Sequence, residues 1–95
     1  MTAIQKTRCA KIAEHYGEGH QLCILQEECA ELIQAVSKIR RETPNAYENF
    51  LDEIADVSIM IEQMLSFMDD DERTDLHKKI NEKINRQIEK ITKGV

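Results

Sequence analysis

Two short acidic motifs hold the residues best suited to chemistry in this sequence. Glu28-Cys29-Ala30-Glu31 and Glu53-Ile54-Ala55-Asp56 each place two carboxylates three residues apart, within an apolar pattern of helical period. Residues at i and i+3 lie on the same face of a helix, so each motif would direct its two carboxylates the same way. Carboxylates beside a packing face are costly unless their charge is offset, and hard divalent cations prefer oxygen ligands. The motifs therefore predict a metal site suited to phosphate chemistry.

The separation of the motifs suits a helical hairpin. Twenty-one residues lie between Glu31 and Glu53, with Pro44 near the middle. The chain advances 13 residues from Glu31 to Pro44 and 12 residues from Pro44 to Asp56. At 1.5 Å per residue, both motifs would lie roughly 18–20 Å from the turn. We therefore expect Glu28, Glu31, Glu53 and Asp56 to meet at one height as metal ligands.

The ligand types narrow the choice of metal. Four carboxylates could hold Mg2+ or Mn2+, or form a di-iron site. Di-iron bundles use Glu-x-x-His motifs, and none of His15, His20 and His77 lies three residues after a Glu. Zinc is disfavoured because its usual Cys and His ligands are not clustered. We expect Mg2+, with Mn2+ as the alternative.

A basic segment near the end of the chain offers a partner for phosphate groups. Lys83 and Arg86 are three residues apart and share a helix face, so both could bind the phosphates of a substrate. Asn81 and Asn85 are weaker candidates for substrate contacts. A solvated basic face is the alternative interpretation of the same residues.

Composition and periodicity predict that helices position these residues. One Pro, three Gly and no Trp among 95 residues leave little turn punctuation, which favours long helices over a sandwich or barrel. We expect an all-α bundle of one short and three longer helices, as a single domain over residues 1–95. Asn45 followed by Glu48 resembles a capping box, and the acidic run 69–72 is expected to separate the last two helices. The first two helices are expected over about 2–16 and 20–42. The third is expected to start near Asn45 and to include Tyr47 to Met68, and the fourth is expected to include Leu76 and to end near Gly94.

Several classes of protein are disfavoured. The net charge of -5 has the wrong sign for a general nucleic-acid binder. No apolar run approaches the roughly 20 residues of a membrane span, and the N-terminus lacks the apolar core of a signal peptide. Three Cys without a C-x-x-C pair indicate reduced thiols in a cytoplasmic protein. A chain this small with long apolar stripes also favours a homodimer or homotetramer.

The paired motifs resemble the E-x-x-E…E-x-x-D signature of the MazG-like, all-α nucleoside triphosphate pyrophosphohydrolases. The wider strings Glu27–Leu32 and Asp52–Val57 match the flanks usual in that family, and Lys83-Ile84-Asn85-Arg86 is similar to its basic segment. The similarity extends over roughly residues 21–90. The paired motif is fairly specific, whereas either half alone would be a weak signal.

The resemblance implies an enzyme that uses Mg2+ to hydrolyse a nucleoside triphosphate to the monophosphate and pyrophosphate. Glu28, Glu31, Glu53 and Asp56 would hold the metal, and Glu28 is the preferred residue for activating water. Dimers or tetramers with sites built partly across the interface are typical of the family, which bacteria and their phages encode. Two alternatives are a non-catalytic helical dimerisation module and a nucleotide sensor without turnover.

Overall fold

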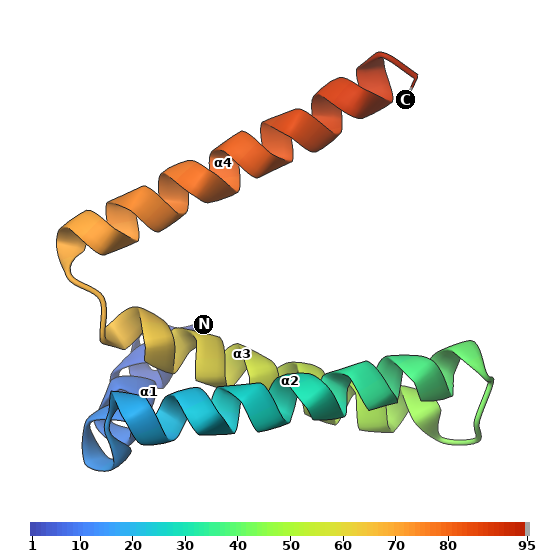
Figure 1. Ribbon diagram of the computed structural model, residues 1–95. Coiled ribbons are helices and arrows are strands. Elements are labelled where there is room, and N and C mark those ends of the chain that lie inside the picture. Colours follow the sequence, from blue (N-terminus) through green and yellow to red (C-terminus); the bar gives the residue numbers. More distant parts are fainter. Residues whose placement is uncertain (95) are drawn as a thin grey trace.

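The computed structural model describes residues 1–94, which contain four α-helices and no strand. Helix α1 spans Ala3–Tyr16, α2 spans Glu18–Arg40, α3 spans Ala46–Ser66 and α4 spans Asp70–Thr92 (Figure 1). Their lengths of 14, 23, 21 and 23 residues confirm the prediction of one short and three longer helices. No helix within this range has the length and apolarity needed to cross a membrane.

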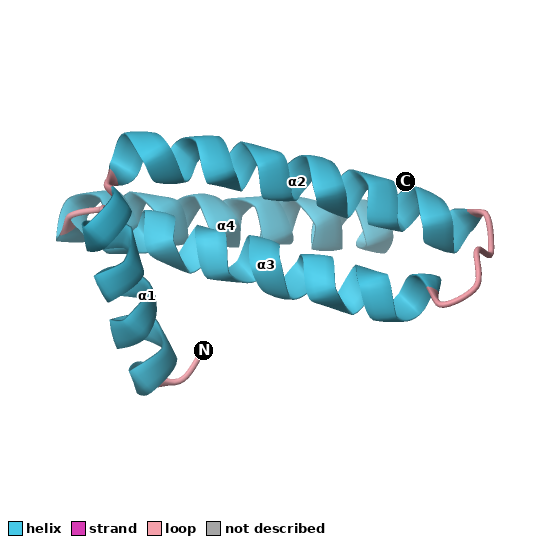
Figure 2. Ribbon diagram, turned by 90° about the horizontal axis from the view of Figure 1, so that it is seen from below, coloured by secondary structure: helices cyan, strands magenta, loops and turns pink. Residues whose placement is uncertain are grey.

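Helices α2 and α3 form the antiparallel hairpin that the motif spacing predicts. They run side by side along most of their length, and α1 packs across the end of the hairpin, mainly on α3 (Figure 2). Two alanines, Ala13 on α1 and Ala35 on α2, are at most 1% exposed where the helices pack together. Small side chains let helix backbones approach closely, so the two motif-bearing helices are held near each other.

A buried polar contact joins the two helices near α1. The Gln21 side chain of α2 donates from Nε2 to Oε1 of Gln63 on α3 at 2.7 Å, and both residues are nearly inaccessible. His20 Nδ1 lies 2.6 Å from Gln21 Oε1, and the His20 ring stacks on Tyr16. Buried amides must find partners, so this pair favours one register of α2 against α3.

The helix ends correct three sequence-based expectations. Asn45 adopts a left-handed backbone with φ of 61° and makes no side-chain cap bond, so the capping box predicted with Glu48 is wrong. N-cap side chains act from an extended backbone, which the left-handed conformation excludes. Asp69 instead caps α4, accepting from the Glu72 N–H at 2.8 Å. Residues 70–72 are therefore the first turn of α4 and do not separate it from α3. Helix α2 begins at Glu18 and not near residue 20, so Gly19 lies within α2 and only Gly17 stands between α1 and α2.

Helix α4 does not join the bundle that α1–α3 form. It diverges from the hairpin after the short connection 67–69, and no residue of α4 is buried (Figure 1). The expected four-helix bundle is therefore found for three helices only. Within one chain, the apolar side of α4 has no surface to cover it.

Candidate metal centre

The structure brings the four predicted carboxylates together across the hairpin. Glu28 and Glu31 come from α2, and Glu53 and Asp56 come from α3. One carboxylate oxygen from each residue lies within 4.8 Å of the others. The motifs therefore meet at one height, as their equal distances from the turn predict. Their role as metal ligands stays a prediction.

The four side chains differ in exposure. Glu28 and Glu53 are half-buried in the seam between the helices, whereas Glu31 and Asp56 are exposed. Glu28 and Glu53 each have a buried Oε2 atom without a hydrogen-bond partner among the described residues. A buried carboxylate oxygen without a partner is costly, because it has lost its water and gained nothing. The cluster therefore has two buried acceptor atoms that the described protein leaves unsatisfied and that a cation could satisfy.

The pKa values of the two half-buried carboxyls, Glu28 and Glu53, are both raised. Burial raises the pKa of Glu28 above its ordinary value, and the neighbouring Glu31 and Asp56 carboxylates raise it further. Burial is also the first cause of the raised pKa of Glu53, followed by the same two neighbours. Loss of water and repulsion between like charges both disfavour ionisation. The arrangement holds negative charge that the described protein atoms do not offset.

The carboxylates occupy one face of the hairpin, and an apolar surface occupies the other. Ile33 lies two residues after Glu31, and Ile54 lies two residues before Asp56. Two residues correspond to about 200° around a helix axis. Because Glu31 and Asp56 converge on one face, Ile33 and Ile54 must lie together on the opposite face. Both isoleucines are exposed, at 69% and 38%.

The structure does not bring Lys83 and Arg86 to the carboxylates. Both lie on α4, which leads away from the hairpin (Figure 1), and both side chains are exposed. The ion pair found in the described chain joins Arg73 to Asp70 within α4. Asn81 and Asn85 are likewise exposed on α4. The phosphate-binding role of Lys83 and Arg86 therefore stays a prediction from the sequence, and it requires α4 of another chain or a different position of α4.

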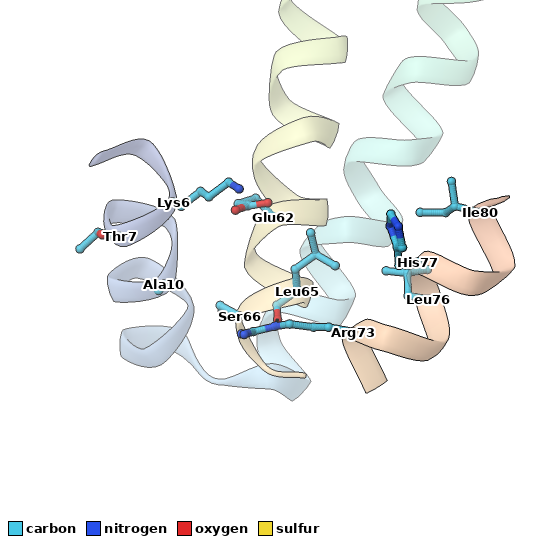
Figure 3. Close-up of a pocket in the computed structure, with 10 residues that line it drawn as sticks. All are labelled: Lys6, Thr7, Ala10, Glu62, Leu65, Ser66, Arg73, Leu76, His77 and Ile80. Carbon is cyan, nitrogen blue, oxygen red and sulfur yellow. Dashed lines mark hydrogen bonds between the residues drawn. The ribbon is translucent and has the colours of Figure 1, made fainter. Parts of the chain in front are cut away.

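Other groups near the hairpin make no comparable cluster. Cys29, inside the first motif, is a half-buried free thiol, and Cys9 and Cys23 are also free. The sequence does not predict the buried Gln21–Gln63 pair, because glutamine is usually exposed. Its signal was the position of Gln63 three residues after Met60, on the buried side of α3. A cavity of about 560 Å³ lies elsewhere, between α1, α3 and α4, and none of the four carboxylates lines it (Figure 3).

Comparisons with known proteins leave the carboxylate cluster as the main guide to function. No protein-family model, no curated protein and no solved structure matches the chain.

Proposed function

We propose that this chain is a Mg2+-dependent nucleoside triphosphate pyrophosphohydrolase. The observation that carries the proposal is the meeting of four carboxylates with two buried, unpartnered oxygens, on Glu28 and Glu53. The donor set fits a hard divalent cation, because all the ligand atoms are carboxylate oxygens. The E-x-x-E and E-x-x-D spacing, which resembles that of the MazG-like enzymes, supports the choice of substrate. Mn2+ is the alternative cofactor.

The four carboxylates have distinct roles in this proposal. Glu28, Glu31, Glu53 and Asp56 would hold the ion, which when bound can polarise a phosphoryl group and activate water. Glu28 is also the proposed base, because its half-buried carboxyl has a raised pKa and so holds a proton more tightly than an exposed glutamate. One water molecule is consumed, the bond between the α- and β-phosphates breaks, and the monophosphate and pyrophosphate leave.

Substrate binding depends on residues outside the cluster. Lys83 and Arg86 are the proposed phosphate ligands, Arg through two parallel hydrogen bonds and Lys as a point charge. The exposed positions of Glu31 and Asp56 leave one side of the cluster open to a nucleotide. The protein would work as a homodimer or homotetramer in the cytoplasm, without binding nucleic-acid polymers or membranes.

A nucleotide panel with pyrophosphate readout tests the proposal. Release of pyrophosphate should require Mg2+ or Mn2+, stop with a chelator and be lost in Glu53→Gln. Nucleotide binding without turnover would identify a sensor instead. Absence of both would leave a helical dimerisation module, an alternative that the exposed apolar side of α4 favours.

A further inference from the structure

The apolar side of α4 is exposed, and the carboxylate site does not explain it. Four isoleucines spaced by four, four and three residues follow Leu76 on one side of the helix. Their exposed fractions rise from 45% at Ile80 to 74% at Ile91. A stripe of this kind normally faces a core, and no part of the described chain covers it. This surface, the α4 stripe, consists of Leu76, Ile80, Ile84, Ile88 and Ile91.

A second exposed apolar surface lies on the hairpin, opposite the carboxylates. Its six members come from α2 and α3, and each is at least 38% exposed. Six large apolar side chains exposed on one side of a monomer indicate an interaction site. This surface, the hairpin apolar face, consists of Leu22, Ile33, Val36, Leu51, Ile54 and Ile61.

The two surfaces begin beside each other and then separate. Leu65 follows Ile54 by eleven residues, about three turns, and so lies on the same side of α3. Leu65, Leu76 and Ile80 line the cavity of about 560 Å³ at the base of α4 (Figure 3). Beyond this point α4 diverges from the hairpin (Figure 1). Each surface therefore stays uncovered along most of its length.

The base of α4 is held in its diverging direction. Arg73 Nε donates to the Leu65 carbonyl at 3.1 Å, which links the first turn of α4 to the last turn of α3. The Asp69 cap holds the Glu72 N–H at 2.8 Å. These bonds, together with the three-residue connection, oppose folding of the stripe back onto its own hairpin. A second chain can reach both surfaces without breaking them.

The exposed area matches what a permanent dimer would bury. The chain exposes 7700 Å², whereas a folded monomer of 11.0 kDa is expected to expose about 5,600 Å². The difference, about 2,100 Å², falls within the roughly 1,000–2,500 Å² that each partner buries in obligate homodimers. The radius of gyration of 16.3 Å likewise exceeds the roughly 12 Å expected of a compact domain of this length. A second copy would account for both excesses.

Charge favours the same partner. Helices α2 and α3 together carry nine acidic and two basic residues, a net charge of -7, and the net charge is -3 without the four carboxylates of the opposite face. The part of α4 from Leu76 to Thr92 carries five basic and two acidic residues, a net charge of +3. Opposite potentials attract the two surfaces and disfavour wrong partners. The stripe of one copy and the hairpin of another are therefore complementary in both apolarity and charge.

We propose that the α4 stripe of each chain docks on the hairpin apolar face of a second copy. Reciprocal docking around a twofold axis covers both surfaces in both chains, as an isologous dimer requires. The carboxylates stay accessible, because they lie on the opposite face of the hairpin. The phosphate-binding role proposed for Lys83 and Arg86 would then require α4 of a further dimer. The proposal does not depend on the function of those carboxylates.

Light scattering after gel filtration tests the dimer with substitutions on each surface. The wild-type chain should have twice the 11.0 kDa mass of one copy. A tetramer made of two such dimers would agree equally well. Ile84→Glu on the stripe and Ile61→Glu on the hairpin should each reduce the mass to a single chain, because each buries a charge in the interface. Asn85→Glu adds the same group beside Ile84 but outside the stripe, and should keep the wild-type mass.

Circular dichroism separates a lost interface from a lost fold. Ile88→Glu gives a second stripe variant that cannot remove a core contact, because α4 has no buried residue. A helical but monomeric Ile88→Glu protein would support the docking even if Ile61→Glu failed to fold. A monomeric wild-type chain at micromolar concentration would overturn the proposal. A wild-type mass retained by Ile84→Glu and Ile88→Glu would overturn it equally, since the interface would then lie elsewhere.

Discussion

Glu28 on α2 and Glu53 on α3 each bury one carboxylate oxygen, and neither buried oxygen has a hydrogen-bond partner in residues 1–94. The two side chains belong to a cluster whose four ligand oxygens lie within 4.8 Å of one another. Packing alone gives no reason to hold like charges this close. A divalent cation would offset the charge and satisfy both oxygens, and this relationship gives the first three predictions.

Mg2+ or Mn2+ should stabilise the chain against heat. An ion that binds the folded state at a hundred times its Kd contributes about 2.7 kcal/mol. For a domain of this size the melting temperature should rise by roughly 10–20 °C, measured by circular dichroism. The exposed Glu27→Gln variant should respond like the wild type, whereas Glu28→Gln should respond little. An equal response in both variants would exclude Glu28 as a ligand.

Glu53→Gln should abolish metal-dependent turnover while keeping the helical fold. Changes to groups that merely support metal ligands cost about 10–100-fold, so loss of a ligand should cost at least about a hundredfold in kcat/KM. The same variant should melt higher than the wild type in chelator, because one of four repelling charges is gone. Glu48→Gln, an exposed change of the same kind on α3, is the control. Full activity of Glu53→Gln would remove Glu53 from the metal site.

Stability without metal should fall as pH rises above the ordinary glutamate range. The folded state raises the pKa of Glu28 and Glu53, first through burial and then through Glu31 and Asp56. Between the ordinary value of 4.5 and the raised values, the folded chain keeps protons that the unfolded chain has lost, so stability decreases with pH. Below this window both states are protonated, and the two groups contribute no pH dependence.

Urea unfolding in chelator at a series of pH values measures this effect. The comparison is between the wild type and the Glu28→Gln/Glu53→Gln double variant, because the other carboxyls are common to both. The stability of the double variant relative to the wild type should increase as pH rises through the window. Parallel pH profiles would show that the two carboxyls do not titrate differently on folding.

The Gln21–Gln63 pair should contribute to stability through its partnership. Gln63→Met keeps a similar volume but leaves the buried Gln21 Nε2 without its acceptor, which should cost about 1–3 kcal/mol. The Gln21→Leu/Gln63→Met double variant removes both polar groups and should recover much of that loss. Exposed Gln34→Met should change stability by less than about 0.5 kcal/mol. Additive losses in the double variant, measured by urea unfolding, would contradict the coupling.

Lys83→Ala and Arg86→Ala should weaken triphosphate turnover more than metal binding. A charged hydrogen bond contributes about 1.5–3 kcal/mol, so kcat/KM should fall roughly ten- to hundredfold. Arg86→Lys should be impaired and Lys83→Arg milder, because only Arg offers two parallel hydrogen bonds to phosphate. Lys78→Ala, on another side of α4, is the control. Unchanged steady-state kinetics in both alanine variants would mean that this basic side of α4 is merely solvated and that the phosphate ligands lie elsewhere.

The amino-acid sequence by itself determined the helical class and the meeting of the motifs. Apolar residues at spacings of three and four mark each helix, and this local pattern does not depend on the rest of the chain. The position of Pro44 about midway between Glu31 and Asp56 sets both motifs at one height, because helix rise is constant. Local spacing is therefore sufficient to predict that these four side chains lie together.

Packing between helices settles what covers each apolar side, which local patterns leave open. The stripe of α4 predicted a buried face, but whether the same chain or another one covers it depends on the direction that the connection 67–69 and Arg73 impose on α4. The left-handed Asn45 and the Gln21–Gln63 contact are also products of packing, since neither residue type requires its observed conformation or burial. Periodicity identifies which side of a helix is apolar, whereas only the arrangement of helices in space decides what lies against that side.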